Sequence, residues 1–319
     1  MVISVRWDAL ERGEWDGVVA EAAPGRRAAL QQDWSYGEAV RAIGGESLRA
    51  ELRWRGAPVA VAQFTARCWR LAGRTLAQAA LCARGPVWLG APDEATKAEC
   101  YRALRRTAPL GWPSLLIFAP DEPAPGEALS AAGLRRVMTG GCAALLRLDG
   151  DDATLRAAMR GKWRNRLVAA ERPGAADALT LAWRRPTSTR LDALLREEAA
   201  QRRARRYCGL PLSLSQALVA LSDPAGAWLL EARRRGHVVA AMLFVRHGRA
   251  ATYHIGWAAP EGRRLAAHNA MLWRAMRDLR DAGVVELDLG GIDTERAAGL
   301  ARFKLGAGAR AAPLCGSYV

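Results

Sequence analysis

The stretch DLGGIDTERAAGLARFKLGAG (residues 288–308) brings together two aspartates, a glycine pair and a Phe-Lys step. It follows the apolar run 284–289, which predicts a strand. Glycine-rich turns after strands bind phosphate groups in several folds. The stretch could therefore be a phosphate loop, a catalytic segment or an ordinary turn from a strand into a helix. Asp293 favours the turn, because Asp is a common cap at the start of a helix.

The usual phosphate loops are absent from the sequence. No Gly-Lys pair is followed by Ser or Thr, and no GxGxxG fingerprint opens a βαβ unit. The four histidines lack metal-binding spacing and the six cysteines form no CxxC pair, so no metal is expected. A GxSxG elbow is also missing. These absences argue against the nucleotide-binding folds, against a metal site and against a serine nucleophile of that type.

One histidine is a candidate for the site. His254 lies in ATYHIGW, a run that predicts a strand, and its side chain could face a cleft and contact a substrate. A structural histidine packed against the sheet is the alternative.

Two basic clusters on expected helices could bind phosphate groups, although a solvated helix face explains such clusters equally. The first lies in the helical pattern 150–174 and contains Lys162, Arg164, Arg166 and Arg172. The second lies near the end of the helical pattern 188–206, next to Tyr207, and contains Arg202, Arg203, Arg205 and Arg206.

An internal repeat indicates the elements that position these residues. AELRWRGAPVAVAQF (50–64) and LEARRRGHVVAAMLF (230–244) are identical at seven of fifteen positions, and each predicts a β-hairpin. Helical segments precede each copy, and a strand, a helix and a buried strand follow it. The order ααββ-β-α-β therefore occurs twice. It predicts an α/β (α+β) fold of two tandem domains, each with a mixed, mostly antiparallel sheet flanked by helices.

The expected domains are residues 1–150 and 151–319, separated near the start of the helical pattern 150–174. The closing segment 310–319 contains a predicted strand that could return to the first domain.

The chain has 319 residues and a formal net charge of +15, with a sequence pI of about 10.6. This charge favours an anionic partner such as a nucleic acid, a nucleotide or an anionic membrane surface. A compositional bias towards arginine and alanine is the alternative. The sequence shows no signal-peptide pattern and no apolar run long enough to span a membrane, so a cytoplasmic location is expected, with peripheral membrane contact left open.

The order of elements resembles the GNAT acyltransferase fold, here in tandem. GNAT enzymes separate two strands of the sheet and bind their donor at the start of the following helix. Their signature in that turn is [Q/R]xxGx[G/A]. The corresponding turns here, ARGPVWLGAPDE (83–94) and AAPEGRRLAAHN (258–269), do not match it. This difference argues against ordinary binding of acetyl-CoA.

Three segments resemble the Fem family (FemA, FemB, FemX), which joins two GNAT-like domains. The closing DLGGID…GLARFKLGAG is the most specific. MRGKWRNRLVAAER (159–172) resembles the basic helix that opens the family's second domain, and LQQDWSYGEAV (30–40) resembles an early helix of the first. The family transfers amino acids from aminoacyl-tRNA to peptidoglycan precursors.

The resemblance implies an aminoacyltransferase that needs no cofactor, with tRNA and an amine acceptor as its partners. Lys304 matches the family's lysine at the ester, Phe303 could stack on the terminal base, and Asp288 could orient or deprotonate the amine. The first basic cluster would meet the donor, and the acceptor side would comprise Arg203, Arg206, Tyr207 and His254. Two alternatives remain open: an acyl-CoA-dependent N-acyltransferase, and a non-catalytic RNA-binding relative. If Phe303 packs in the core and Lys304 is solvated, neither residue has a functional role.

Overall fold

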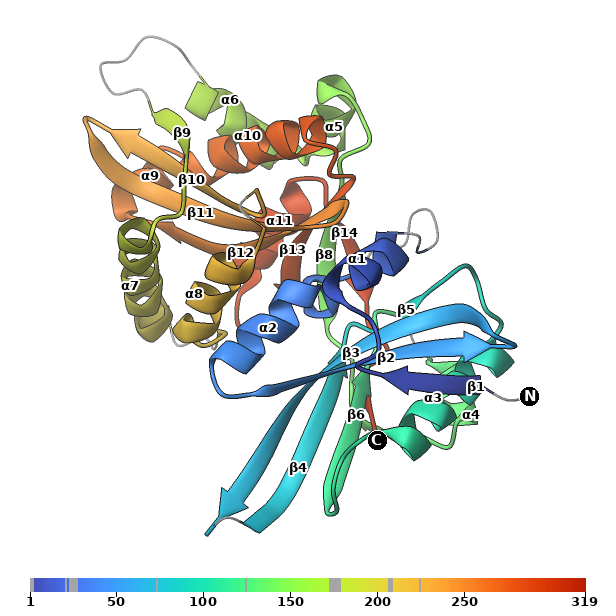
Figure 1. Ribbon diagram of the computed structural model, residues 1–319. Coiled ribbons are helices and arrows are strands. Elements are labelled where there is room, and N and C mark those ends of the chain that lie inside the picture. Colours follow the sequence, from blue (N-terminus) through green and yellow to red (C-terminus); the bar gives the residue numbers. More distant parts are fainter. Residues whose placement is uncertain are drawn as a thin grey trace. The chain divides into compact units, whose positions relative to one another are not determined.

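The computed structural model describes residues 3–20, 22, 28–72, 74–123, 125–171, 179–205, 209–223 and 225–319, and the statements below concern these residues. The chain divides into two compact units (Figure 1). Unit 1 is Met1–Gly141 with Pro313–Val319, and unit 2 is Cys142–Ala312. Each unit contains a mixed sheet flanked by helices, which confirms the predicted fold class.

The sheet of unit 1 has the strand order β1-β2-β3-β4-β6-β15-β7, with β5 paired to β3. Its strands are β1 (Ile3–Trp7), β2 (Glu46–Trp54), β3 (Ala57–Leu71), β4 (Arg74–Ala83), β5 (Val87–Trp88), β6 (Ser114–Ala119), β7 (Arg136–Met138) and β15 (Ser317–Tyr318). Its helices are α1 (Arg12–Ala20), the 3-10 helix η1 (Leu30–Gln32), α2 (Trp34–Ala42), α3 (Glu94–Thr107) and α4 (Glu127–Ala131).

The core of unit 1 forms where α3 packs on one face of this sheet. Phe64, Tyr101 and Phe118 are fully buried there, with ring centroids 5.8 and 5.2 Å apart in edge-on contacts. Asp93 caps α3, as its position in the sequence predicts, because its carboxylate accepts a hydrogen bond from Thr96 N at 2.7 Å.

The sheet of unit 2 has the order β14-β8-β13-β12-β11-β10-β9. Its strands are β8 (Cys142–Arg147), β9 (Thr180–Arg184), β10 (Ala227–Arg234), β11 (His237–His247), β12 (Ala250–Ala258), β13 (Glu286–Ile292) and β14 (Arg310–Pro313). Its helices are α5 (Asp152–Ala158), α6 (Gly161–Glu171), α7 (Ser188–Arg205), α8 (Leu212–Leu221), α9 (Pro260–Arg264), α10 (Ala267–Asp281) and α11 (Ala298–Gly306).

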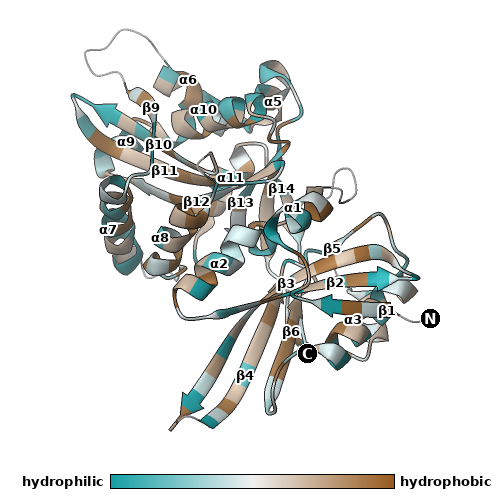
Figure 2. Cartoon of the chain, in the orientation of Figure 1, coloured by the Kyte–Doolittle hydropathy of each residue, from teal (hydrophilic) through white to brown (hydrophobic). Residues whose placement is uncertain are grey.

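Helices cover both faces of the unit 2 sheet. The main core cluster joins one face to α5, α6 and α10, and a second cluster joins the other face to α7 and α8. Figure 2 shows that α7 is largely hydrophilic, whereas α8 beside it is largely hydrophobic. α10 ends just before Gly283, whose φ of +85° allows Val284 N to bond back to Leu279 O at 2.9 Å.

The start of unit 2 differs from the sequence-based boundary near residue 150. β8 precedes that position, yet it pairs with β13 through Leu145↔Asp288 and Ala143↔Gly291 and so belongs to unit 2. The helical pattern 150–174 is broken into α5 and α6, because Met159 between them has an extended backbone. Among the described residues, no helix is both long and apolar enough to cross a membrane.

Candidate functional site

The parallel strands β12 and β13 of unit 2 pair only at their first residues. The pairing runs from Ala250↔Glu286 to Thr252↔Asp288, and β12 then continues to Ala258 away from β13. Backbone N–H and C=O groups along the separated edges need other partners, and an amide-containing ligand can supply them.

Unit 1 shows no such separation between its parallel strands. β4 and β6 pair continuously from Gln78↔Ser114 to Ala83↔Ala119, where both strands end. At the start of the next helix, α3, the buried Lys97 lies 2.7 Å from Glu94 and 3.6 Å from Glu122. These carboxylates place negative charge where a GNAT fold would hold its anionic donor. Among the described residues, the separation of parallel strands that a GNAT fold uses therefore occurs in unit 2.

The glycine pair of the C-terminal stretch forms the end of β13. Gly290 has a φ of +79°, and its N–H donates to Asp288 Oδ1 at 2.6 Å. The carbonyl of Gly291 accepts a hydrogen bond from Lys304 Nζ at 2.7 Å. A Cβ at position 290 would lie 3.5 Å from the same Nζ. The turn therefore brings Asp288 and Lys304, sixteen positions apart in the sequence, to one place.

Lys304 is a buried cation on α11, with a relative exposure of 6%. Burial lowers the pKa of its ammonium group to about 8, and the Asp288 carboxylate opposes this lowering. The group is still mainly protonated at pH 7. An ammonium has three donors, so Lys304 can hold Gly291 O and also donate to a carbonyl oxygen of a substrate.

Phe303 is half-buried and packs between aromatic residues of two other helices. Its ring centroid lies 6.0 Å from that of Trp163 on α6 and 6.1 Å from that of His268 on α10. A Cβ at Gly306 would lie 2.9 Å from the Trp163 ring, so this glycine allows α11 to approach α6 closely. The contacts with Phe303 connect the helix that carries Lys304 to the predicted donor helix.

The predicted donor cluster lies on the outer face of α6. Trp163 and Leu167 of this helix are buried. The basic side chains between them and beside them are exposed to solvent, and they are Lys162, Arg164 and Arg166. α6 can therefore present positive charge while its apolar face holds α11.

His254 occupies an irregularity of β12 that faces α8. Tyr253 pairs with Phe244 and Ile255 with Leu243, so His254 is the extra residue of a β-bulge. Its Nε2 lies 2.9 Å from Ser215 Oγ.

Burial lowers the pKa of His254 to about 4, although the Glu198 carboxylate opposes this effect. The imidazole is therefore neutral at pH 7 and can accept a proton or a hydrogen bond. Glu198 is itself held by Arg202 at 2.7 and 3.1 Å. This pairing commits Arg202, a member of the second basic cluster, to a neighbouring helical carboxylate.

The structure places the remaining predicted residues away from the contacts of His254 or does not describe them. Arg203 is exposed on α7. Arg206 and Tyr207 lie outside the described residues. Asp293 does not cap α11 as expected, because its carboxylate accepts from Glu295 N and Arg296 N in the preceding turn. α11 begins only after that turn.

The turn between β12 and α10 contains a short helix, α9, which the sequence pattern did not indicate. The N–H groups of Ala266 and Asn269 are bonded to Arg263 O and Ala266 O. Arg263 donates to Gln201 of α7 at 3.0 Å. Several backbone donors that a pyrophosphate would need are thus bonded within the turn.

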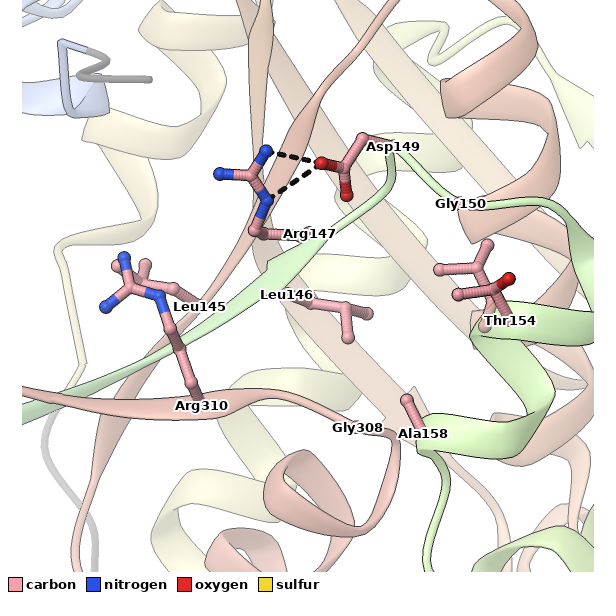
Figure 3. A pocket seen from close by; sticks show the side chains of 10 residues that line it. Leu145, Leu146, Arg147, Asp149, Gly150, Thr154, Ala158, Gly308 and Arg310 are labelled. Carbon is pink, nitrogen blue, oxygen red and sulfur yellow. Dashed lines mark hydrogen bonds and ion pairs between the residues drawn. The ribbon is translucent and has the colours of Figure 1, made fainter.

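A cavity of about 460 Å³ lies among the end of β8, α5 and the start of β14 (Figure 3). None of the predicted site residues lines it. Its two arginines already face carboxylates, since Arg147 pairs with Asp149 at 3.0 Å and Arg310 lies 3.6 Å from Glu286.

Comparisons with known proteins agree with this fold. Residues 157–305 match the family model described as an acetyltransferase (GNAT) domain. No curated protein is significantly similar to the chain in sequence. Among solved structures, FemX superimposes with a TM-score of 0.78 at 14% identity, over 98% of this chain and 96% of that one.

Two further structures resemble the whole chain. A tandem GNAT protein from the clavulanic acid biosynthesis pathway gives a TM-score of 0.54 at 13% identity, over 99% of this chain and 98% of that one. The C-terminal domain of a putative lysylphosphatidylglycerol synthetase from Agrobacterium fabrum gives 0.54 at 16% identity, over 97% and 92%. At these identities the likeness concerns the fold, and at that level the expected resemblance to the Fem family is confirmed.

Proposed function

We propose that this chain, an acyltransferase built from two GNAT-like units, transfers an aminoacyl group from aminoacyl-tRNA to an amine acceptor. A peptidoglycan precursor is the acceptor class that the Fem resemblance suggests. The observation that carries the proposal is the buried Lys304, held by Gly291 O beside the point where β12 and β13 separate.

The reaction needs little from the protein besides charge and orientation, because an aminoacyl ester is already activated. The acceptor amine attacks the ester carbonyl, the C–N bond forms, and the oxyanion receives a hydrogen bond from Lys304. The ester C–O bond then breaks, and the leaving 3′ oxygen takes a proton from Lys304. Asp288 can accept the proton that the attacking amine loses. Transfer of this proton to Lys304 restores the ammonium group.

Two features support tRNA over coenzyme A as the donor. The turn 258–269 lacks the GNAT signature. Several backbone N–H groups of this turn already donate to carbonyl groups within and next to α9. α6 carries the exposed Lys162, Arg164 and Arg166, which suit a phosphate backbone. We assign these three to the donor and His254, with Arg203, to the acceptor side.

The test is a transfer assay with a pool of radiolabelled aminoacyl-tRNA and a panel of amines that includes peptidoglycan precursors. We expect a labelled amide product. Product formation from acetyl-CoA or another acyl-CoA, with every charged tRNA inert, would refute the proposal.

That opposite result would establish the second candidate, an acyl-CoA-dependent N-acyltransferase. The description of the matched family model as an acetyltransferase domain favours it. Calorimetric titration distinguishes the two, because the second candidate requires saturable binding of free coenzyme A.

A further inference from the structure

Large apolar side chains gather on unit 1 at the free end of the β3–β4 hairpin. β3 continues past its last pairing with β2, Glu46↔Ala66, and pairs onward with β4. Figure 1 shows these strand ends extending past β2, together with the start of β6. The exposed apolar residues here, which we call the hairpin patch, are Trp69 (51%), Leu71 (66%), Leu76 (54%), Trp112 (90%) and Leu115 (47%).

The strand register places members of the hairpin patch on the same side of the sheet. Trp69 pairs with Ala77, and Ala79 pairs with Leu115. Paired residues share a face, and so do residues two apart along a strand. Trp69 and Leu115 are therefore on one face, opposite the face on which Phe64 enters the core.

A glutamine ties Trp112 to this hairpin. Gln78 of β4 accepts a hydrogen bond from Gly111 N at 2.8 Å and donates from its own N–H to Pro113 O at 3.0 Å. Its amide also lies 3.7 Å from Cys68 Sγ on β3. The loop that carries Trp112 is thus fixed beside the hairpin end.

The two segments that carry the patch contain positive charge and no negative charge. Residues 66–78 and 105–118 contain no Asp or Glu. Their basic residues, all exposed, are Arg67, Arg70, Arg74, Arg105 and Arg106. Figure 2 shows hydrophilic and hydrophobic bands alternating along the free ends of β3 and β4. Tryptophan prefers the boundary between lipid headgroups and acyl chains, and arginine binds lipid phosphates with paired hydrogen bonds.

We propose that the hairpin patch docks unit 1 on an anionic lipid bilayer. Trp69 and Trp112 lie at the headgroup level, Leu71 and Leu76 enter the acyl region, and the arginines contact lipid phosphates. A protein partner would need a complementary acidic surface, whereas an anionic bilayer supplies both the apolar layer and the phosphates that this composition requires. The inference concerns unit 1 and does not depend on the acyl donor.

The test is co-sedimentation of the full chain with vesicles of phosphatidylglycerol and phosphatidylcholine, and with vesicles of phosphatidylcholine alone. We expect binding to the anionic vesicles that weakens with salt. The double variant Trp69→Ser/Trp112→Ser should bind about tenfold or more weakly. Val137→Ser, which changes an equally exposed residue of unit 1 (61%), serves as the matched control and should bind normally.

The arginines provide a second test that leaves the apolar residues in place. Arg70→Gln and Arg74→Gln should each weaken binding about fivefold, whereas Arg55→Gln, at the β2–β3 turn, should not. Equal binding by the wild type and all variants, or equal binding to neutral vesicles, would overturn the proposal. So would a wild-type dimer that the tryptophan variant dissociates and that does not bind vesicles, because the patch would then join two copies of the chain.

Discussion

Lys304 is the residue on which the proposed chemistry depends. Its ammonium is buried and donates to the backbone carbonyl of Gly291 at 2.7 Å, near the Asp288 carboxylate. A cation in this position contributes little to folding, because burial penalises its charge. Its three donors are instead suited to binding an anionic or carbonyl group.

Lys304→Met should separate activity from stability. We expect kcat/KM to fall by about 10²–10³, the range for loss of one oxyanion donor, with an unchanged or higher thermal midpoint. The matched control is Lys162→Met, which removes an exposed lysine and should affect mainly KM for tRNA. A Lys304→Met enzyme with wild-type turnover would remove this residue from the chemistry.

The lowered pKa of Lys304 predicts two effects of pH. Activity that needs the ammonium should fall as pH rises through about 8. The free energy of unfolding should instead rise with pH. Between about pH 8 and 10.5, Lys304 binds more protons in the unfolded chain than in the folded chain. Raising the pH in this range therefore stabilises the folded chain. Denaturant titrations at several pH values in this range should show that the free energy of unfolding rises more steeply with pH in the wild type than in Lys304→Met. Identical slopes would contradict the assigned pKa.

Sequence reasoning identified Phe303 and Lys304 as a pair but did not show how they are held. The ring of Phe303 contacts Trp163 and His268, which are distant in sequence, so no local pattern could indicate these contacts. The sequence did not predict the contact between Ser215 and His254 for the same reason, because these residues are also distant in sequence. Their functional roles stay predictions until tested.

At the scale of elements, the turn at the end of β13 determines where Lys304 lies. Gly290 has a positive φ, which an alanine adopts at a penalty of about 1 kcal/mol. A Cβ there would only touch Lys304 Nζ, at 3.5 Å, so the effect of a side chain would come from strain in the turn that holds Lys304.

Gly290→Ala should therefore lower both the thermal midpoint and kcat. Gly283→Ala is the matched control, because Gly283 has a similar φ of +85° with open space around its Cβ position. It should lose comparable stability and keep its kcat. If both variants lose the same activity, the effect of Gly290 is only structural.

The order of the main elements followed from the sequence because hydrophobic periodicity is strong in the hairpins and in α10. The short elements could not be predicted from the sequence. α9 spans only Pro260–Arg264, and edge strands such as β7 and β14 depend on partners elsewhere in the chain. The break between α5 and α6 also has no proline or strong breaker at Met159.

At the scale of the whole molecule, the two units differ in how their parallel strands pair. β12 and β13 separate after three paired positions, whereas β4 and β6 stay paired to their ends. The repeated sequence could not reveal this difference, because strand separation is set by pairing between distant segments.

The positive charge of the molecule should act on tRNA binding through α6. Replacing Lys162, Arg164 and Arg166 by Gln should weaken tRNA binding. The slope of the logarithm of the binding constant against the logarithm of the salt concentration should become shallower by about 2–3. The thermal midpoint should stay unchanged, since all three are exposed. Filter binding at several salt concentrations gives both values. An unaltered salt slope would place the tRNA elsewhere.

The central claim is that the activated donor is aminoacyl-tRNA. Single-turnover transfer from purified, radiolabelled aminoacyl-tRNA to an amine acceptor, with excess unlabelled acetyl-CoA present, measures it most directly. The account predicts a labelled amide at a rate that acetyl-CoA leaves unchanged and that Lys304→Met lowers about 10²–10³-fold. Transfer of the acetyl group instead, with the tRNA ester intact, would contradict it.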